Sequence, residues 1–155
     1  RQVPEDINGY VELRSKLTVP IAGGENEHTL FGYKSLFENG AVDIAQPDIG
    51  SCGGITAAKH IIALAHSFGV EVNPHVWGSA IAQAASIQVI ASIPNTHHSI
   101  FARSPILEYD QSSHPFRREL LNQPIELNNG MVDVSSKSGL GIEVNLSTIK
   151  KYKTN

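Results

Sequence analysis

The 155-residue chain contains little cysteine and no excess of basic charge. Cys52 is its single cysteine, so no disulfide can form within the chain, and this fits a reducing compartment such as the cytosol. The formal net charge is −3, and lysine and arginine form no long run. Because binding to phosphate backbones requires clustered basic side chains, we expect no nucleic acid as a main partner.

The sequence also lacks an apolar run of the roughly 20 residues needed to cross a bilayer. Its first residues do not show the charged-then-apolar pattern of a signal peptide. Hydrophobic residues make up 41% and charged residues 17% of the chain, which are the proportions of an ordinary globular protein. We therefore expect a folded, soluble, cytoplasmic protein with no membrane partner.

Short apolar segments alternate with longer amphipathic ones over the first 110 residues. The short segments have strand character and cover residues 17–22, 43–46, 71–74 and 105–107. The longer segments have helical spacing and cover residues 29–39, 55–68 and 79–93. This alternation predicts strand–helix units with parallel strands, as in (β/α)-barrels and doubly wound sheets.

Each expected strand is followed directly by an ionisable residue: Glu25, Asp48, His75 and Glu108. The carboxyl ends of parallel strands meet at one edge of a sheet or barrel, where ligands bind and chemistry occurs. The sequence therefore predicts a site at this edge.

Four strands cannot close an eight-stranded barrel, so we predict an α/β fold that is the C-terminal half of a (β/α)-barrel, over residues 1–110. Residues 4–10 form a capped helix start with no strand before them. After Glu108 the alternation stops, and residues 123–134 favour a hairpin turning at 128–130. A short strand at 140–144 and a helix at 146–152 complete a β-rich C-terminal return segment over residues 111–155.

Asp48 and His75 are candidates for a general-base dyad, in which the carboxylate fixes the tautomer and orientation of the imidazole. Glu25 follows two glycines and has the oxygen ligands that Mg²⁺ prefers. Glu108 is a candidate proton donor to an oxyanion if burial keeps it protonated. The simpler alternatives are a turn-capping Asp48, a structural His75, a solvated Glu25, and an ion pair of Glu108 with an arginine.

Other residues near the strand ends have weaker claims. Trp77 and Ser79 are candidates to line a substrate pocket, although Trp77 could instead pack beneath the following helix. For the remaining histidines a structural or surface role is favoured: His28, His60, His66, His97, His98 and His114. The arginines that could pair with Glu108 are Arg103 and Arg117.

Four motifs occur in order between residues 4 and 152: Gly24-Glu25-Asn26, Gln46-Pro47-Asp48 with Gly53-Gly54-Ile55-Thr56, Pro74-His75-Val76-Trp77-Gly78, and Leu107-Glu108. Together they resemble the mandelate racemase branch of the enolase superfamily, also called the mandelate racemase/muconate lactonizing enzyme family. The resemblance implies the enolase C-terminal domain-like half-barrel. It also implies that the N-terminal capping domain and the first half of the barrel would precede Arg1.

The resemblance implies chemistry in which Mg²⁺ binds a substrate carboxylate, a base removes the α-proton, and the enediolate is stabilised. It makes Glu25 the third metal ligand, Asp48 and His75 the dyad, and Glu108 the acid. Trp77, Asn26 and Ser79 are then substrate-binding candidates, and the full-length protein a homo-oligomer. The other two metal ligands and a lysine base would lie outside these 155 residues, so we expect the chain alone to bind Mg²⁺ poorly and to be inactive.

Three functions remain open at this stage. The first is an acid-sugar dehydratase acting on a small carboxylate substrate. The second is a racemase or epimerase of a 2-hydroxy or amino acid on the same scaffold. The third is a truncated half-barrel with no catalytic role.

Overall fold

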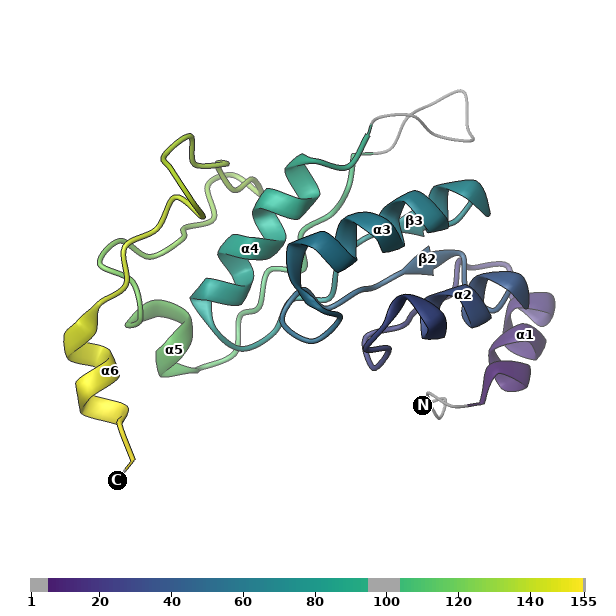
Figure 1. Ribbon diagram of the computed structural model, residues 1–155, viewed down its shortest axis with the longest axis horizontal. Coiled ribbons are helices and arrows are strands. Elements are labelled where there is room, and N and C mark those ends of the chain that lie inside the picture. Colours follow the sequence, from purple (N-terminus) through teal and green to yellow (C-terminus); the bar gives the residue numbers. More distant parts are fainter. Residues whose placement is uncertain (1–5, 95–103, 155) are drawn as a thin grey trace.

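Three short parallel strands form the sheet of the protein, and helices alternate with them along the chain (Figure 1). The computed structural model describes residues 6–94 and 104–154. The strands are β1 (Ala22–Gly23), β2 (Ile44–Ala45) and β3 (Glu71–Val72), which pair in the order β1-β2-β3. The helices are α1 (Ile7–Lys16), α2 (Leu30–Glu38), α3 (Gly54–Ser67), α4 (Ala80–Ala91), α5 (Pro115–Arg118) and α6 (Leu146–Tyr152). Each strand is thus followed by a helix, as in a parallel (β/α) unit.

The core lies between one face of the sheet and helices α2 and α3. Gly23, Ala45 and Val72 lie side by side in the strand register and are buried, whereas the neighbouring position in each strand is half-buried or exposed. Buried residues of α2 and α3 belong to the same apolar cluster as the strands: Tyr33, Leu36, Phe37, Ala58, Ile61, Ile62 and Ala65. One sheet face therefore carries the core, and the opposite face is less deeply buried.

The prediction of a fourth strand at residues 105–107 was wrong. The sheet in the described part of the chain has three strands, and these residues are not among them. Side-chain hydrogen bonds hold this segment beside the end of β3 instead. The Ile106 N–H donates to Asn73 Oδ1 at 2.9 Å, and the Val76 N–H donates to Glu108 Oε2 at 3.2 Å. Pro74 and Pro105 have no N–H to donate, so a continuous backbone ladder cannot form here.

The C-terminal return segment has less strand pairing than predicted. The hairpin turn is present, with Asn128 and Met131 exchanging backbone hydrogen bonds of 2.8 and 2.9 Å around Asn129 and Gly130, both at positive φ. Pairing among the described residues of this segment is limited to that bridge and one between Leu121 and Val144. The predicted terminal helix is α6, and α5 was not predicted.

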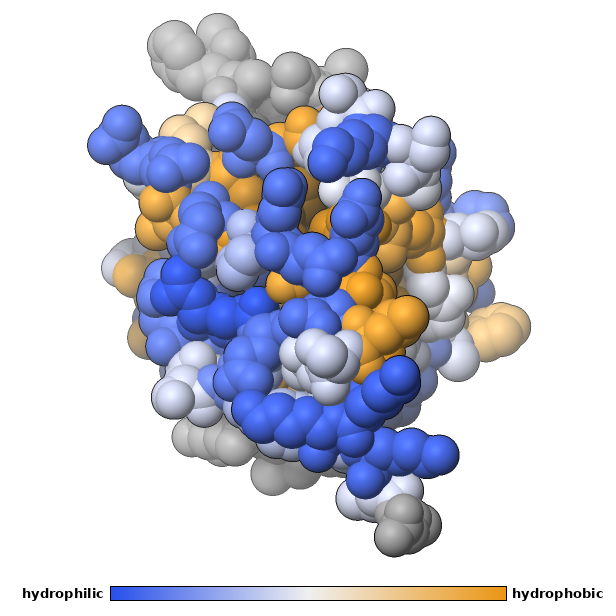
Figure 2. All heavy atoms as spheres, turned by 90° about the vertical axis from the view of Figure 1, so that its left-hand side faces the viewer, coloured by the Kyte–Doolittle hydropathy of each residue, from blue (hydrophilic) through white to orange (hydrophobic). Residues whose placement is uncertain are grey.

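The return segment packs against the outside of α4. Leu120 and Leu121 are buried, and Gln88 of α4 donates to the Ser135 carbonyl at 3.3 Å. Figure 2 views the α6 end, where hydrophilic side chains dominate but apolar patches lie among them. The exposed apolar residues of α6 include Leu146 and Ile149. In the part of the chain that the structure describes, no helix has the length and apolar character to span a bilayer.

A carboxylate joins α1 to the sheet. Arg14 Nε donates to Asp43 Oδ1 at 2.7 Å, and the Ile21 N–H donates to Asp43 Oδ2 at 2.8 Å. Partial burial by itself would raise the pKa of Asp43, but the Ile21 hydrogen bond and the Arg14 charge outweigh it and hold that pKa below its usual value. The ionised carboxylate is thus favoured by folding.

We predict that Asp43→Asn lowers the free energy of unfolding by about 1 kcal/mol at pH 7, since a charge-assisted hydrogen bond is lost. Because the pKa of Asp43 is lower in the folded than in the unfolded protein, its carboxylate stabilises the fold at pH values above its unfolded pKa, which is about 4. This stabilisation is lost as the pH falls through the folded-state pKa. Denaturant unfolding at pH 7, 5 and 3 should therefore show the gap from the native protein closing at low pH. A gap that is constant across pH would contradict this role of the charge.

Candidate active site

The structure brings Asp48 and His75 into hydrogen-bond contact at the ends of β2 and β3. His75 Nδ1 lies 2.8 Å from Asp48 Oδ2. The other carboxylate oxygen, Oδ1, accepts the Gly50 N–H at 2.7 Å, which fixes the plane of the carboxylate. Because an ionised carboxylate only accepts, Nδ1 carries a proton in this contact, and Nε2 is the free ring nitrogen when the imidazole is neutral. This is the tautomer that a general base requires at Nε2.

Glu25 faces the same imidazole from the end of β1. Its Oε2 lies 3.5 Å from His75 Nε2, and its side chain is 40% exposed. Gly24 has φ +109°, a backbone conformation that residues with a Cβ rarely adopt. The Glu27 N–H donates to the Gly24 carbonyl at 3.0 Å, which closes a turn with Glu25 and Asn26 at its centre. The glycine and the turn together direct Glu25 toward His75.

Glu25 has the chemistry of a Mg²⁺ ligand, since hard cations prefer carboxylate oxygens. Among residues 6–94 and 104–154, however, no group of three or more His, Cys, Asp or Glu residues is placed to hold a metal ion. The described residues therefore do not form a complete metal site by themselves, and Glu25 could supply one carboxylate to such a site. Mg²⁺ would complete its coordination with ligands from elsewhere.

Glu108 lies beside the backbone that follows His75, because its carboxylate accepts a hydrogen bond from the Val76 N–H. The residue is exposed in this structure, so the burial that a proton-donor role requires is not supplied by the described residues. Of its two candidate ion-pair partners, Arg103 lies outside the described residues. Arg117 stacks 5.0 Å above the Tyr109 ring and donates to the Ser112 carbonyl at 3.4 Å.

The three substrate-binding candidates occupy different surroundings. Trp77 is 62% exposed, which rules out packing beneath α4, and its ring meets the His114 ring edge-on at 6.1 Å. Ser79 is the N-cap of α4, with its hydroxyl accepting the Ala82 N–H at 3.2 Å. Asn26 is exposed in the Glu25 turn. Trp77 and Asn26 thus remain accessible, whereas the hydroxyl oxygen of Ser79 caps the helix.

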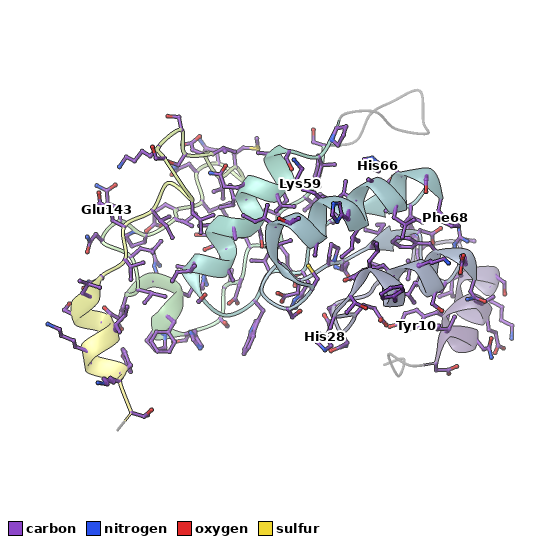
Figure 3. All side chains as sticks on the ribbon, viewed as in Figure 1. Tyr10, His28, Lys59, His66, Phe68 and Glu143 are labelled. Carbon is purple, nitrogen blue, oxygen red and sulfur yellow. The ribbon has the colours of Figure 1, made fainter. Side chains whose placement is uncertain are left out.

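Other described histidines lie on α3 and in loops. Figure 3 shows His66 and Lys59 on α3 and His28 in the loop before α2. His60 is exposed on α3, and His97 and His98 lie outside the described residues. Cys52 is buried in the loop after Asp48, and burial followed by the Asp48 charge raises the pKa of its thiol. The thiol therefore stays protonated and fills the glycine-rich loop.

The sequence analysis missed Tyr33, which supports the site from α2. The sequence predicted only that Tyr33 belongs to an amphipathic helix. A hydrogen bond from its side chain to a carbonyl nine residues earlier has no signature in the local sequence pattern.

The fold is a partial (β/α)-barrel with the ionisable side chains of Glu25, Asp48 and His75 gathered at its carboxyl edge. The family model described as "Enolase C-terminal domain-like" matches residues 2–148. The chain belongs to this family, within the mandelate racemase/muconate lactonizing enzyme group of the enolase superfamily.

Named relatives support this assignment. The chain is 37% identical over 151 residues to D-galactarolactone cycloisomerase of Agrobacterium fabrum, covering 97% of this chain and 40% of that protein. It is 32% identical over 149 residues to D-xylonate dehydratase of Haloferax volcanii, covering 96% and 34% respectively. The crystal structure of 3,6-anhydro-D-galactonate cycloisomerase from Zobellia galactanivorans matches with a TM-score of 0.86 and 38% identity, over 97% of this chain and 40% of that one. The chain therefore spans about 40% or less of the length of these relatives.

Proposed function

We propose that the site removes the proton α to the carboxylate of an acid sugar and then expels an oxygen from the β-carbon. The contact between His75 Nδ1 and Asp48 Oδ2 is the observation that carries this proposal, because it leaves Nε2 as a proton acceptor at the strand ends. The activity is that of the complete gene product, since the described residues supply one metal-ligand candidate. The names of the relatives, which include a cycloisomerase and a dehydratase for sugar acids, support the substrate class.

In the proposed reaction, His75 Nε2 accepts the α-proton, and the C–H electron pair forms the double bond of an enediolate. Asp48 holds the ring in place and stabilises the imidazolium that forms. The protonated His75 then gives its proton to the departing β-oxygen. Glu25 is the proposed Mg²⁺ ligand, and bound Mg²⁺ supplies charge stabilisation to the substrate carboxylate.

The identity of the leaving oxygen separates two products. If hydroxide leaves, the protein is a dehydratase, and the product is a 2-keto-3-deoxy acid lighter than the substrate by one water. Dehydration is the reaction that we propose first. Loss of a ring oxygen opens a cyclic sugar acid without a change of mass, and the 37% identity to a cycloisomerase favours this second candidate. A racemase, the third possibility, exchanges the α-proton without forming a keto acid.

The test is to screen the complete gene product with Mg²⁺ against open and cyclic sugar acids in deuterated water. Mass spectrometry and a keto-acid assay distinguish dehydration, ring opening and racemisation. Absence of both a keto acid and α-deuterium would refute the proposal and favour a non-catalytic half-barrel.

We predict that Glu25→Gln weakens Mg²⁺ binding at least about tenfold, because a neutral amide is a poorer ligand than a carboxylate for a hard cation. Calorimetric titration of the complete gene product with Mg²⁺ measures the effect. Glu27→Gln is the matched control, since it makes the same change two residues along, where the carboxylate lies over Gly32 at the start of α2. Equal affinity in Glu25→Gln and native protein would remove Glu25 from the metal site.

A further inference from the structure

Tyr33 is fully buried on α2, and its hydroxyl reaches the turn that carries Glu25. The side chain has 0% exposure. Its hydroxyl donates to the Gly24 carbonyl at 2.6 Å. The same carbonyl accepts the Glu27 N–H at 3.0 Å, so the hydroxyl bonds to the oxygen that closes the turn. The contact therefore joins the helix to the turn at the residue before Glu25.

The ring of Tyr33 also fixes the conformation of Gly24. A Cβ added at Gly24 would lie 2.9 Å from Tyr33 Cε1, closer than side chains normally approach. The glycine thus allows two things at once, the positive φ of +109° and the close approach of the aromatic ring. Ring and hydroxyl together leave the turn little freedom to move away from α2.

We infer that Tyr33 is a positioning residue for the candidate active site, whose buried hydroxyl holds the turn over residues 24–27 so that Glu25 is presented to His75. Glu25 Oε2 lies 3.5 Å from His75 Nε2, a separation set by this turn and by the end of β3. Tyr33 does not itself touch the reacting atoms. The consequence for metal binding rests on the proposed function, whereas the consequence for the turn does not.

Burial keeps the hydroxyl available as a donor. Burial raises the pKa of Tyr33 far above its usual value, and the nearby carboxylates of Glu27 and Asp48 raise it further. The phenol therefore stays protonated at neutral pH and donates to the Gly24 carbonyl. A surface tyrosine would exchange this bond for one to water.

Tyr33→Phe tests the inference, since it removes the hydroxyl and keeps the ring. Amide hydrogen exchange followed by NMR on the full chain should show the Glu27 amide exchanging about tenfold faster, with amides of α3 changing much less. In the complete gene product, the Mg²⁺ concentration for half-maximal α-proton exchange should rise about fivefold or more, with kcat at saturating Mg²⁺ changing less. Unchanged exchange at the Glu27 amide would overturn the inference.

The matched control is Tyr109→Phe, because the Tyr109 hydroxyl also donates to a backbone carbonyl, that of Ile125, at 2.8 Å. This variant should leave the exchange rate of the Glu27 amide and the Mg²⁺ requirement unchanged. The comparison distinguishes loosening of the turn from a general loss of stability. Faster Glu27 exchange with an unchanged Mg²⁺ requirement would overturn the positioning role. If the native protein shows no α-proton exchange, the proposed function fails, and Glu27 exchange alone then decides whether Tyr33 holds the turn.

Should Tyr33→Phe not fold, the native protein still provides a test. A buried, bonded hydroxyl proton exchanges slowly with water and is observable by NMR. Detection of a slowly exchanging Tyr33 hydroxyl proton supports the bond to Gly24, and rapid exchange overturns it.

Discussion

Replacing His75 by asparagine is expected to lower the rate of α-proton exchange at least about 1,000-fold in the complete gene product. Asparagine can still donate a hydrogen bond to Asp48, but its amide has no nitrogen lone pair of sufficient basicity to accept the proton. The His75 side chain is 20% exposed and lies at the edge of the core, so the melting temperature should change by only about 2 °C. Deuterium uptake from heavy water at the α-carbon, followed by NMR, measures the rate.

His60→Asn provides the control for this variant. His60 is exposed on α3, so the same chemical change there should leave exchange at the native rate. If His75→Asn kept more than about a tenth of the native rate, His75 would not be the base, and the proton acceptor would have to lie elsewhere in the complete protein.

Helix positions were the part of the fold that local sequence rules predicted best. Helices α2, α3, α4 and α6 begin and end within about two residues of the predicted segments. Their starts are set by short-range chemistry, as at Ser79, whose hydroxyl accepts the Ala82 N–H, and Asn145, whose side chain accepts the Ser147 N–H at 3.0 Å. The four-residue helix α5 was missed because so short a helix has no apolar period.

Strand lengths could not be predicted from the same patterns. The segment 17–22 has strand composition, but pairing begins only at Ala22. Hydrogen bonding between strands depends on partners far along the chain, and two prolines prevent residues 105–107 from completing a ladder with the end of β3. Strand composition therefore located these segments without determining how far each one pairs.

The candidate site was predictable to the extent that it follows from strand ends. Parallel strands place their carboxyl ends together, and the structure accordingly puts Glu25 and Asp48 on either side of His75. The exposure of Glu108 and the contact of Tyr33 with Gly24 depend on tertiary packing that no local pattern encodes. The catalytic and binding roles of these residues stay predictions until variants are measured.

Asp48→Asn is expected to lower the rate of α-proton exchange about 1,000-fold by changing the histidine tautomer. The Gly50 N–H donates to Asp48 Oδ1, so the amide oxygen of asparagine should keep that position and its NH₂ group should take the place of Oδ2. The NH₂ group would then donate to His75 Nδ1, the ring proton would move to Nε2, and Nε2 could no longer accept the α-proton. Nitrogen NMR of the imidazole distinguishes the two tautomers directly.

Asp43→Asn is the matched control for this change, because the Asp43 carboxylate also accepts a backbone N–H, that of Ile21. Asp43 directly precedes β2, whereas Asp48 follows it, so the control lies at the other end of the strand. Its lower stability should not change the rate per folded molecule. An Asp48→Asn variant that retained the proton on Nδ1 and the native rate would show that the carboxylate serves only to cap its turn. A slow variant with the proton on Nε2 would instead tie the rate to the tautomer, since the imidazole itself would still be present in the site.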